Sequence, residues 1–452
     1  MPEDDFHFLT SALVLGLGAS GEAAARLLRA RAVAVTVLDA GSGPALEAKA
    51  RILRDAGCVV RTGPRELPDT TAGVAVVSPG IPATDAWVVA LRARGIPVIS
   101  ELELGWRARR SRVLAVTGSN GKSTLAKLCH EAILCNGFTS VVGGNYGTPL
   151  SALVGMDPAP EWIVAEVSSF QLETVDRFAP DAGILLNLNP NHLDRHGSME
   201  EYTAMKARVF ARMDAGQAAV IPEDASEAIR RAIPAGACVT TFGTTRSASI
   251  RYEPGRLVGA TLDTQVSLEG TIFDNEIMGS TAAACAAALV GAGLSARGVE
   301  SAARGFARLP HRMQTKAVIK GVTFIDDSKA TNLAALSAGL RMVAGPTRLI
   351  AGGLLKESDL EPVKKVLANG VRGVYIIGRY SGVMAAAWRD VVPCMICENL
   401  KEAVLRAWSE ATAGETVLLS PGCASFDQFK SFEDRGEQFS EIVKEIEKEN
   451  RL

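Results

Sequence analysis

The chain repeats one pattern of hydrophobic and polar positions. A short, continuous apolar run is followed by a turn of glycine and small polar residues, and then by a segment whose apolar residues recur at helical spacing. The stretch "SALVLGLGASGEAAARLLRA" at 11–30 is one instance, and "VLAVTG" at 113–118 followed by "KSTLAKLCHEAIL" at 122–134 is another. Apolar strands that alternate with amphipathic helices are typical of parallel sheets covered by helices. The pattern therefore predicts an α/β protein.

The repeats fall into three blocks. The first adds the strands "VAVTVLD" and, as its predicted third strand, "GVAVVSPGIP". The second adds "EWIVAEVSSFQLE", a strand that ends at Glu166, then the strand and loop "DAGILLNLNPNHLDRHG" and the helix "SMEEYTAMKARVF". The third holds strands in "GVTFIDDSKATN", "TRLIAGGLLKESDL", "VYIIGRY" and "ETVLLSPGCASF". Because 452 residues are too many for one hydrophobic core, we expect two to four domains. The three blocks correspond to predicted domains at 1–106, 107–308 and 309–452.

Composition narrows the class of protein. The formal net charge of −2 gives no reason to expect a nucleic-acid partner. The acidic start "MPEDDFHF" lacks the order of a signal peptide, and the most apolar run, "TAAACAAALVGAGL", is too short to cross a bilayer. Eight scattered cysteines fit a reducing compartment. We therefore expect a cytoplasmic protein without a membrane partner, and we interpret the one C-x-x-C pair, Cys394 and Cys397, as core.

The first block carries a G-x-G-x-x-G motif in a strand–turn–helix context. Gly16, Gly18 and Gly21 lie between the first apolar strand and an amphipathic helix, and Asp39 ends the next strand. Such a turn delivers a diphosphate to a helix N-terminus. Asp39 could accept a hydrogen bond from a ribose hydroxyl of NAD or from a uridine moiety, and the glycines could also serve only a tight turn.

The second block carries a shortened phosphate-binding loop. In "TGSNGKST" at 117–124 the first glycine is Gly118, whereas the usual G-x-x-x-x-G-K-[ST] spacing would place it at Val116. The loop keeps its position between a strand and a helix, together with Lys122 for the β- and γ-phosphates and Ser123 for Mg²⁺. We therefore predict nucleoside triphosphate binding.

Polar residues follow the strand ends of the second and third blocks, where parallel sheets bind ligands. Glu166 is expected near a metal held by Ser123, since Mg²⁺ prefers oxygen ligands. By composition alone His192 is an ordinary loop histidine and Lys206 a solvated surface lysine. In the third block Thr331, Lys356 and Ser425 combine hydroxyl and cationic groups and favour a small carboxylate ligand. Finally, the C-terminal helix carries a stripe predicted to face the core: Phe439, Ile442, Val443 and Ile446.

Together, "TGSNGKST", "GGNYG", "EVSSFQLE", "NHLDRHG", "LPHRMQ", "DDSKATN" and "LLSPGCASFDQFKSFEDRG" resemble the Mur ligase family, and among its members the one that adds D-glutamate. The resemblance implies a Rossmann-like N-terminal domain, a P-loop-type central ATPase domain and a Rossmann-like C-terminal domain. It implies a monomeric, ATP-dependent amide ligase that joins D-glutamate to UDP-N-acetylmuramoyl-L-alanine through an acyl phosphate, in cytoplasmic peptidoglycan precursor synthesis.

The resemblance also implies site residues. Two Mg²⁺ ions would be held, one by Ser123 and Glu166, the other by His192 and a carbamylated Lys206. ATP would contact Gly118, Ser119, Asn120, Gly121, Lys122, Ser123, Thr124, His311, Arg312, Asp327 and Lys329. The UDP substrate would contact Ala19, Ser20, Asp39, Gly80, Asn145, Ser168 and Gln171. D-Glutamate would contact Thr331, Lys356, Ser425 and Phe432. The catalytic group would comprise Lys122, Glu166, His192 and Lys206.

The chain departs from the family pattern in the run "GSTAAAC" at 279–285. Thr281, Ala282 and Cys285 stand where the family has His, Asn and Asn at the adenine. Tyr146 and the pair Leu354–Leu355 are smaller departures. Two other functions remain open: a nicotinamide-dependent oxidoreductase, which would leave the ATP loop unexplained, and a related ligase such as folylpolyglutamate synthase or another Mur ligase.

Overall fold

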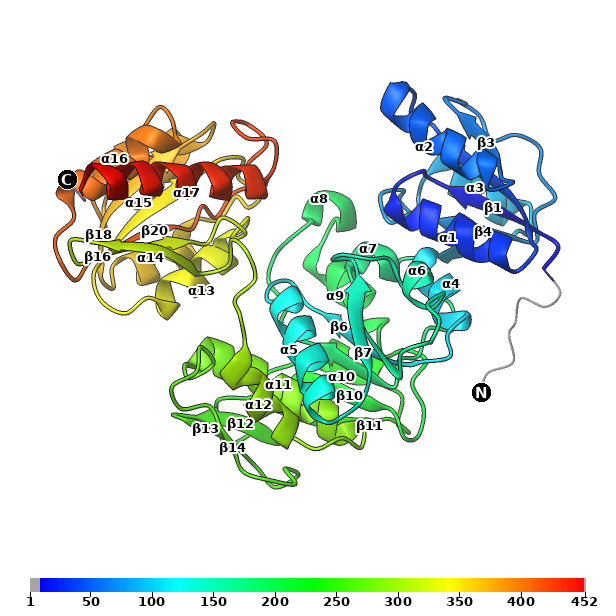
Figure 1. The fold of residues 1–452 in the computed structure, drawn as a ribbon, viewed down its shortest axis with the longest axis horizontal. Helices are drawn as coiled ribbons and strands as arrows, with labels where there is room; N and C mark the ends of the chain where they lie inside the picture. Colours follow the sequence, from blue (N-terminus) through cyan, green and yellow to red (C-terminus); the bar gives the residue numbers. More distant parts are fainter. Residues whose placement is uncertain (1–8, 451–452) are drawn as a thin grey trace. The chain divides into compact units, whose positions relative to one another are not determined.

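The fold was analysed in a computed structural model that describes residues 9–450. The acidic start "MPEDDFHF", on which part of the localisation prediction rests, lies outside the described residues. Within them, three sheets follow one another along the chain (Figure 1). Contacts group the chain into two compact units, one of residues up to Leu188 with Leu193–Phe306, the other of Asn189–His192 with Ala307–Leu452. The predicted α/β class is confirmed.

The N-terminal sheet is parallel throughout, in the order β3-β2-β1-β4-β5. Helices α1 and α2 pack on one face and α3 on the other, so both faces of the apolar strands are buried. Its strands are β1 (Ser11–Leu15), β2 (Ala34–Asp39), β3 (Val59–Thr62), β4 (Val74–Val77) and β5 (Val98–Ser100). Its helices are α1 (Ala19–Ala30), α2 (Pro44–Asp55), α3 (Ala86–Ala93) and α4 (Glu101–Arg107).

The central sheet has the order β14-β13-β12-β11-β10-β9-β6-β8-β7 and is parallel except for its last two strands, β13 and β14. Helices α5, α11 and α12 pack together, with α5 and α11 lying against the parallel strands. Its strands are β6 (Arg112–Thr117), β7 (Ser140–Gly144), β8 (Trp162–Glu166), β9 (Ala182–Leu185), β10 (Ala218–Pro222), β11 (Cys238–Gly243), β12 (Ile250–Glu253), β13 (Arg256–Gly259) and β14 (Val266–Ser267). Its helices are α5 (Lys122–Cys135), α6 (Leu150–Leu153), α7 (Ser169–Leu172), α8 (Leu193–His196), α9 (Met199–Ala207), α10 (Glu227–Ala232), α11 (Glu276–Gly291) and α12 (Arg297–Gly305).

The C-terminal sheet has the order β15-β16-β20-β17-β18-β19, and only the β15–β16 pair is antiparallel. Helices α16 and α17 cover one face and α13, α14 and α15 the other. Its strands are β15 (Gln314–Ile319), β16 (Val322–Asp326), β17 (Thr347–Gly352), β18 (Val371–Ile377), β19 (Cys394–Ile396) and β20 (Thr416–Leu419). Its helices are α13 (Leu333–Met342), α14 (Glu361–Leu367), α15 (Ser381–Trp388), α16 (Leu400–Glu410) and α17 (Phe432–Glu449).

Two details of the predicted secondary structure are wrong. The strand in "GVAVVSPGIP" is the fourth of its block, because β3 intervenes; β3 is short and half exposed, so its apolar signal is weak. The segment with Asp194 and His196 is not a plain loop, because Leu193–His196 form the single helical turn α8. The predicted core stripe of α17 is confirmed, since Phe439, Ile442, Val443 and Ile446 are all buried. The three predicted domain borders stay predictions.

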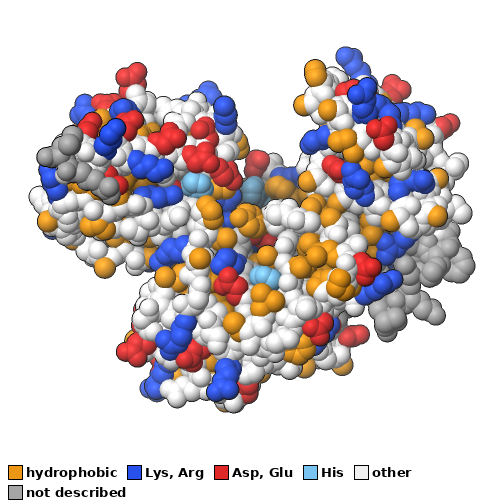
Figure 2. All heavy atoms as spheres, in the orientation of Figure 1, with side chains coloured by type: hydrophobic (Ala, Val, Ile, Leu, Met, Phe, Trp, Pro, Cys, Tyr) orange, Lys and Arg blue, Asp and Glu red, His pale blue; other side chains and the backbone are white. Residues whose placement is uncertain are grey.

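The positions of Cys394 and Cys397 and the charges on the surface fit the expectations from composition. Cys397 packs into the core on one face of the C-terminal sheet and Cys394 against the core on the other, so the two thiols do not face each other. On the face drawn in Figure 2, basic and acidic side chains are interspersed. No helix in residues 9–450 is long and apolar enough to span a bilayer.

Candidate active site

The loop "TGSNGKST" bridges β6 and α5. Gly121, at the N-cap of α5, has φ +80°, and a Cβ there would stand 2.9 Å from the Leu186 Cδ2 atom. The backbone conformation therefore favours glycine here, and any larger residue would also have to displace the Leu186 side chain. The loop opens a helix of 14 residues, whose first N–H groups and dipole favour an anion. The predicted position between strand and helix is confirmed.

A side chain that the sequence analysis missed fixes this loop. Asn187, just past β9, accepts hydrogen bonds from the backbone N–H of Ser119 at 3.1 Å and of Asn120 at 2.9 Å, and donates to the Asn120 carbonyl at 3.0 Å. The Tyr202 hydroxyl lies 3.1 Å from Ser119 Oγ. The sequence could have indicated Asn187 by its position just past a parallel strand. The neighbouring strand in the sheet is the one that leads into the loop.

Lys122 lies against the loop that it follows. Its Nζ donates to the carbonyls of Gly118 at 3.0 Å and Ser119 at 3.1 Å. Both carbonyls belong to the loop, so the ammonium group is held within reach of an anion that the loop amides would bind. A point charge at this place suits a phosphate.

Ser123 and Glu166 are brought together, as predicted from their strand and helix ends. Ser123 Oγ donates to Glu166 Oε2 at 2.6 Å, and Asn145 Nδ2 donates to Glu166 Oε1 at 2.9 Å. Glu166 is only 3% exposed. No cluster of three or more His, Cys, Asp or Glu side chains that could hold a metal occurs among the residues described. A hydroxyl and one carboxylate fit Mg²⁺, which commonly completes its coordination with phosphate oxygens and water.

Lys206 is buried, so its interpretation as a solvated lysine was wrong. The residue is 2% exposed on α9. Its Nζ donates to the Gly118 carbonyl at 2.9 Å and lies 4.8 Å from the centre of the Tyr202 ring. Burial, with Lys122 nearby, lowers the pKa of the Lys206 amine well below its usual value, while Glu166 acts in the opposite direction. Lys206 therefore contacts the phosphate loop with an amine that is less basic than usual.

The two histidines of "NHLDRHG", His192 and His196, lie in different structural surroundings. His192 has φ +56° and belongs to the segment Asn189–His192, which groups with the second unit. His196 is buried in α8, where its Nε2 lies 2.9 Å from Ser169 Oγ and burial lowers the pKa of its imidazole. His192 as a metal ligand stays a prediction.

Ser168 and Gln171 form a capping box at the start of α7. The Ser168 N–H and hydroxyl both donate to Gln171 Oε1, at 2.9 and 3.0 Å, and the Gln171 N–H donates to Ser168 Oγ at 3.2 Å. The two side chains thus fix the chain just past β8. Their contact with a substrate stays a prediction.

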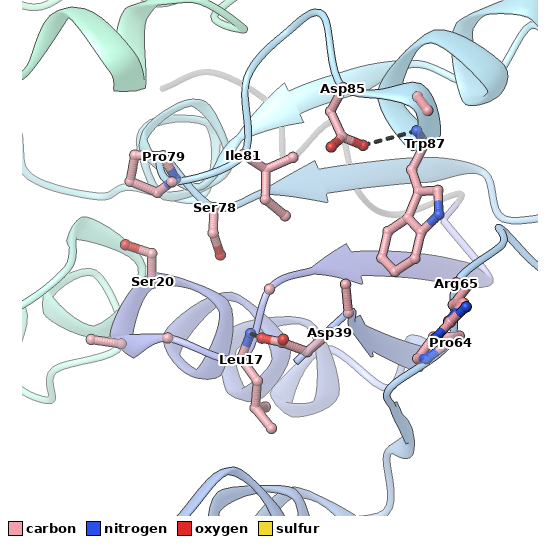
Figure 3. Close-up of a pocket in the computed structure, with 16 residues that line it drawn as sticks. Leu17, Ser20, Asp39, Pro64, Arg65, Ser78, Pro79, Ile81, Asp85 and Trp87 are labelled. Carbon is pink, nitrogen blue, oxygen red and sulfur yellow. Dashed lines mark hydrogen bonds between the residues drawn. The ribbon is translucent and has the colours of Figure 1, made fainter. Parts of the chain in front are cut away.

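The first glycine motif borders a cavity of about 710 Å³ (Figure 3). Four residues predicted for the UDP substrate line it: Ala19, Ser20, Asp39 and Gly80. The Asp39 carboxylate accepts from the N–H of Leu17 at 2.7 Å and of Gly41 at 2.8 Å. A Cβ on Gly21 would stand 1.9 Å from the Gly16 carbonyl oxygen, so the turn needs glycine there. Arg65 and Trp87 also line the cavity, which the sequence did not suggest because Arg65 comes from the loop after β3 and Trp87 from the first turn of α3.

An ion pair connects the rim of this cavity to the central sheet. Arg195 on α8 bonds Glu173 with its Nε and Nη2, both at 2.8 Å, and both side chains are largely buried. Arg195 Nη2 also donates to the Ile81 carbonyl at 3.3 Å, and Glu173 accepts from the Ala83 N–H at 3.1 Å. The 80–83 loop is thereby fixed to α7 and α8.

In the second unit, the residues predicted for the nucleotide cluster at the end of β16. His311 Nδ1 lies 2.7 Å from Asp326 Oδ2. Asp327 accepts from Ser420 Oγ at 2.8 Å and from the Met313 N–H at 3.2 Å. Burial raises the pKa of the Asp327 carboxyl to about 7. Lys329 Nζ lies 3.7 Å from the centre of the Phe432 ring. Arg312 adjoins this cluster in sequence, and its role stays a prediction.

Three of the four residues predicted for D-glutamate lie on segments that are bonded to one another. The N–H of Gly422 donates to the Ala330 carbonyl at 2.8 Å, which joins the loops leading to Ser425 and Thr331. Leu354 and Ala424 pair as an isolated β-bridge, which joins the Lys356 segment. Ser425 is buried and Lys356 exposed. The strand-end pattern thus identified one cluster of segments.

At the family's adenine positions the side chains are small and buried. Thr281, Ala282 and Cys285 lie within α11, and the Thr281 hydroxyl donates to the Ile277 carbonyl at 3.1 Å. Tyr146, the other polar departure, is partly exposed at 44%. None of the three α11 side chains carries an amide, and their place at the adenine stays a prediction.

Comparison with known proteins agrees with this arrangement. Three domain families match in order: "Mur ligase MurD-like, N-terminal domain" at 10–100, "Mur ligase middle domain" at 116–290 and "Mur ligase, glutamate ligase domain" at 311–423. A protein of Acidobacterium capsulatum named UDP-N-acetylmuramoylalanine--D-glutamate ligase is 39% identical over 445 residues, covering 95% of each chain. One of the same name from Desulfatibacillum aliphaticivorans is 35% identical, covering 95% of this chain and 97% of its own.

Solved structures share the fold. The MurF ligase of Thermotoga maritima in complex with ADP superposes with a TM-score of 0.63 at 19% identity, covering 93% of this chain and 96% of its own. MurF from Acinetobacter baumannii gives a TM-score of 0.64 at 16% identity, covering 90% of each. The order of the domains, the phosphate loop and the identity across nearly the whole chain agree with one another. This protein therefore belongs to the Mur ligase family.

Proposed function

We infer that the chain is an ATP-dependent ligase that adds D-glutamate to UDP-N-acetylmuramoyl-L-alanine in peptidoglycan precursor synthesis. The observation that carries this is the identity, over nearly the whole chain, to relatives named for that reaction. The phosphate loop, with Ser123 and Glu166 in contact, supplies the matching chemistry.

The reaction needs ATP because a carboxylate is a poor electrophile in water. The terminal phosphoryl group of ATP passes to an oxygen of the L-alanyl carboxylate, and ADP leaves. The amine of D-glutamate then attacks the acyl carbon to give a tetrahedral intermediate. The carbon–oxygen bond breaks, phosphate leaves with that oxygen, and the nitrogen loses a proton. The products are the amide, ADP and phosphate.

The residues of the central sheet are suited to the first step. The transferred phosphoryl group carries spread negative charge, and catalysis consists mostly of positioning and electrostatic stabilisation. The amides at the start of α5 and the Lys122 ammonium would bind the phosphates. Ser123 and Glu166 would hold Mg²⁺, which neutralises phosphate charge when bound. Asn145 would orient Glu166 through their 2.9 Å hydrogen bond.

For a second Mg²⁺ we propose His192 and a carbamylated Lys206. Carbamylation joins CO₂ to the neutral amine with loss of one proton, and so turns a cation into an anionic oxygen ligand. A buried amine with a lowered pKa is the form that reacts. Its 2.9 Å contact with the Gly118 carbonyl supports a place beside the phosphates.

We propose that the first cavity holds the UDP part, with Asp39, Ala19, Ser20 and Gly80 around it, while Ser168 and Gln171 face the muramoyl part. UDP should therefore stabilise the protein against thermal unfolding, by about 2.7 kcal/mol at about 100 times its Kd, whereas NAD should not. Thermal shift with each nucleotide alone measures this. Stabilisation by NAD and none by UDP would favour the oxidoreductase instead.

For the second unit we propose that His311, Arg312, Asp327 and Lys329 approach the nucleotide. Thr331, Lys356, Ser425 and Phe432 would then form the D-glutamate pocket. Backbone groups would have to replace the amides missing at Thr281, Ala282 and Cys285. A monomeric, cytoplasmic protein with domains at 1–106, 107–308 and 309–452 completes the proposal.

Phosphate release with different amino acids tests the function. With ATP, Mg²⁺ and UDP-N-acetylmuramoyl-L-alanine, D-glutamate should start phosphate release, and L-glutamate and L-lysine should not. Hydroxyl and cationic groups that face two carboxylates explain the expected exclusion of L-lysine, and the preference for D-glutamate over L-glutamate is inferred from the relatives. A response to L-lysine alone would indicate another Mur ligase, and a response to L-glutamate with a folate acceptor would indicate a folylpolyglutamate synthase.

A further inference from the structure

Arg435 is a buried cation whose hydrogen-bond partners are all neutral. It lies in α17 and is 0% exposed. Nε donates to Ser328 Oγ at 2.9 Å, Nη2 to the Ser328 carbonyl at 2.8 Å, and Nη1 to the Cys423 carbonyl at 3.2 Å. Burying a guanidinium group is costly unless its N–H groups find acceptors. The planar fork of donors therefore fixes two loops at once.

Both loops carry residues proposed for the amino-acid pocket. Ser328 lies three residues before Thr331 in the loop after β16, and Cys423 lies two residues before Ser425 in the loop after β20. The two loops are also bonded directly through Gly422 and Ala330.

The same centre reaches the remaining two pocket segments. The Ser328 hydroxyl, which accepts from Arg435, donates to the Phe432 carbonyl at 2.8 Å. Ala424, next to Cys423, exchanges backbone hydrogen bonds with Leu354 at 2.8 and 2.9 Å, two residues before Lys356. Thr331 and Ser425 thus lie within three residues of Ser328 or Cys423, which Arg435 contacts directly, and Phe432 is bonded to Ser328. Lys356 is connected to Arg435 through Cys423, Ala424 and Leu354.

The charge of Arg435 is not neutralised by contact. Burial lowers its pKa to about 10, and Asp427, Asp326 and Asp327 act in the opposite direction. Asp326 is itself engaged by His311 and by Lys316 Nζ at 3.2 Å. At neutral pH Arg435 is therefore positively charged, and it carries this charge at the centre that connects the four segments.

We propose that Arg435 is a positioning residue for the dicarboxylate amino acid: it holds the loops of Thr331, Ser425, Phe432 and Lys356 in one arrangement. This inference rests on the proposed D-glutamate function. On the nucleotide side, Asp327 has anchors of its own, because it is held by Ser420 and Met313. Loss of Arg435 should therefore affect the amino acid more than ATP.

The test compares Arg435→Met and Arg435→Lys with Phe439→Leu in the full-length protein. Phe439 is one turn further along α17, fully buried, and part of the core on one face of the sheet, so its variant reports lost stability alone. Tm and the KM values for D-glutamate, ATP and UDP-N-acetylmuramoyl-L-alanine are measured for each. Arg435→Met should lower kcat/KM for D-glutamate by about 10²-fold, since small misplacements have such effects, with the other two KM values within about twofold. Arg435→Lys should not restore activity, because a point charge cannot replace the fork.

Equal changes in all three KM values, or a loss no larger than in Phe439→Leu at a similar Tm, would overturn the role of Arg435. Recovery of wild-type kcat/KM in Arg435→Lys would also overturn it. If Arg435→Met does not fold, Arg435→Lys carries the same comparison. A wild-type protein that ignores D-glutamate would instead overturn the proposed function, and this inference with it.

Discussion

Lys122→Ala will reduce ATP-dependent phosphate release by on the order of 10²-fold or more, the size of effect seen when one preorganised electrostatic donor is removed. The ammonium group lies on the carbonyls of Gly118 and Ser119, at the point where the phosphates would enter. Its removal takes a positive charge away from the loop at which the phosphoryl group would be transferred. The loop itself should persist, because Asn187 fixes its backbone.

The matched control is Lys127→Ala, one turn further along the same helix. Lys127 bonds Glu131 and lies over the Phe306 ring, away from the loop. This variant should lose little activity, which separates the local charge from a general effect on α5. Near-normal phosphate release in Lys122→Ala would show that the nucleotide binds elsewhere.

Lys206→Arg will be nearly inactive although arginine is the other long basic side chain. Arginine cannot form the carbamate, and its larger, always charged head would have to fit a site where Lys206 is 2% exposed. Isotopically labelled bicarbonate should give a carbamate signal by NMR in the wild type and none in the variant. A similar Tm for both proteins would separate lost chemistry from lost folding.

Arg208→Lys is the control for Lys206→Arg, because Arg208 bonds the Glu173 carbonyl and lies outside the loop. It should keep most of the activity. Full activity in Lys206→Arg, or a carbamate signal that survives the substitution, would remove Lys206 from the mechanism.

The sequence could locate candidate site residues where they lie at the ends of strands and helices. Parallel strands place their carboxyl ends at one edge of a sheet, so the contact between Ser123 and Glu166 followed from two apolar runs. The glycine turn around Gly16 and Gly21 likewise predicted the first cavity. These arguments use only local pattern and the rules of parallel sheets.

Residues that depend on packing between distant segments were missed or misjudged. Lys206 seemed to be a surface lysine by composition because its polarity conceals its burial against the phosphate loop. Arg435 lies in a segment rich in charged residues, and its partner Ser328 is 107 positions away. The Arg195–Glu173 pair spans separate segments in the same way. No local periodicity encodes such contacts.

The most direct measurement of the central claim is the mass of the nucleotide product. The protein is incubated with ATP, Mg²⁺, UDP-N-acetylmuramoyl-L-alanine and D-glutamate, and the UDP-linked species are separated and weighed by mass spectrometry. The predicted result is a product heavier by one glutamyl residue, formed in a one-to-one ratio with phosphate and absent when L-glutamate replaces D-glutamate. An unchanged UDP-linked substrate in the presence of active, folded protein, or a product that carries a different amino acid, would contradict the assignment.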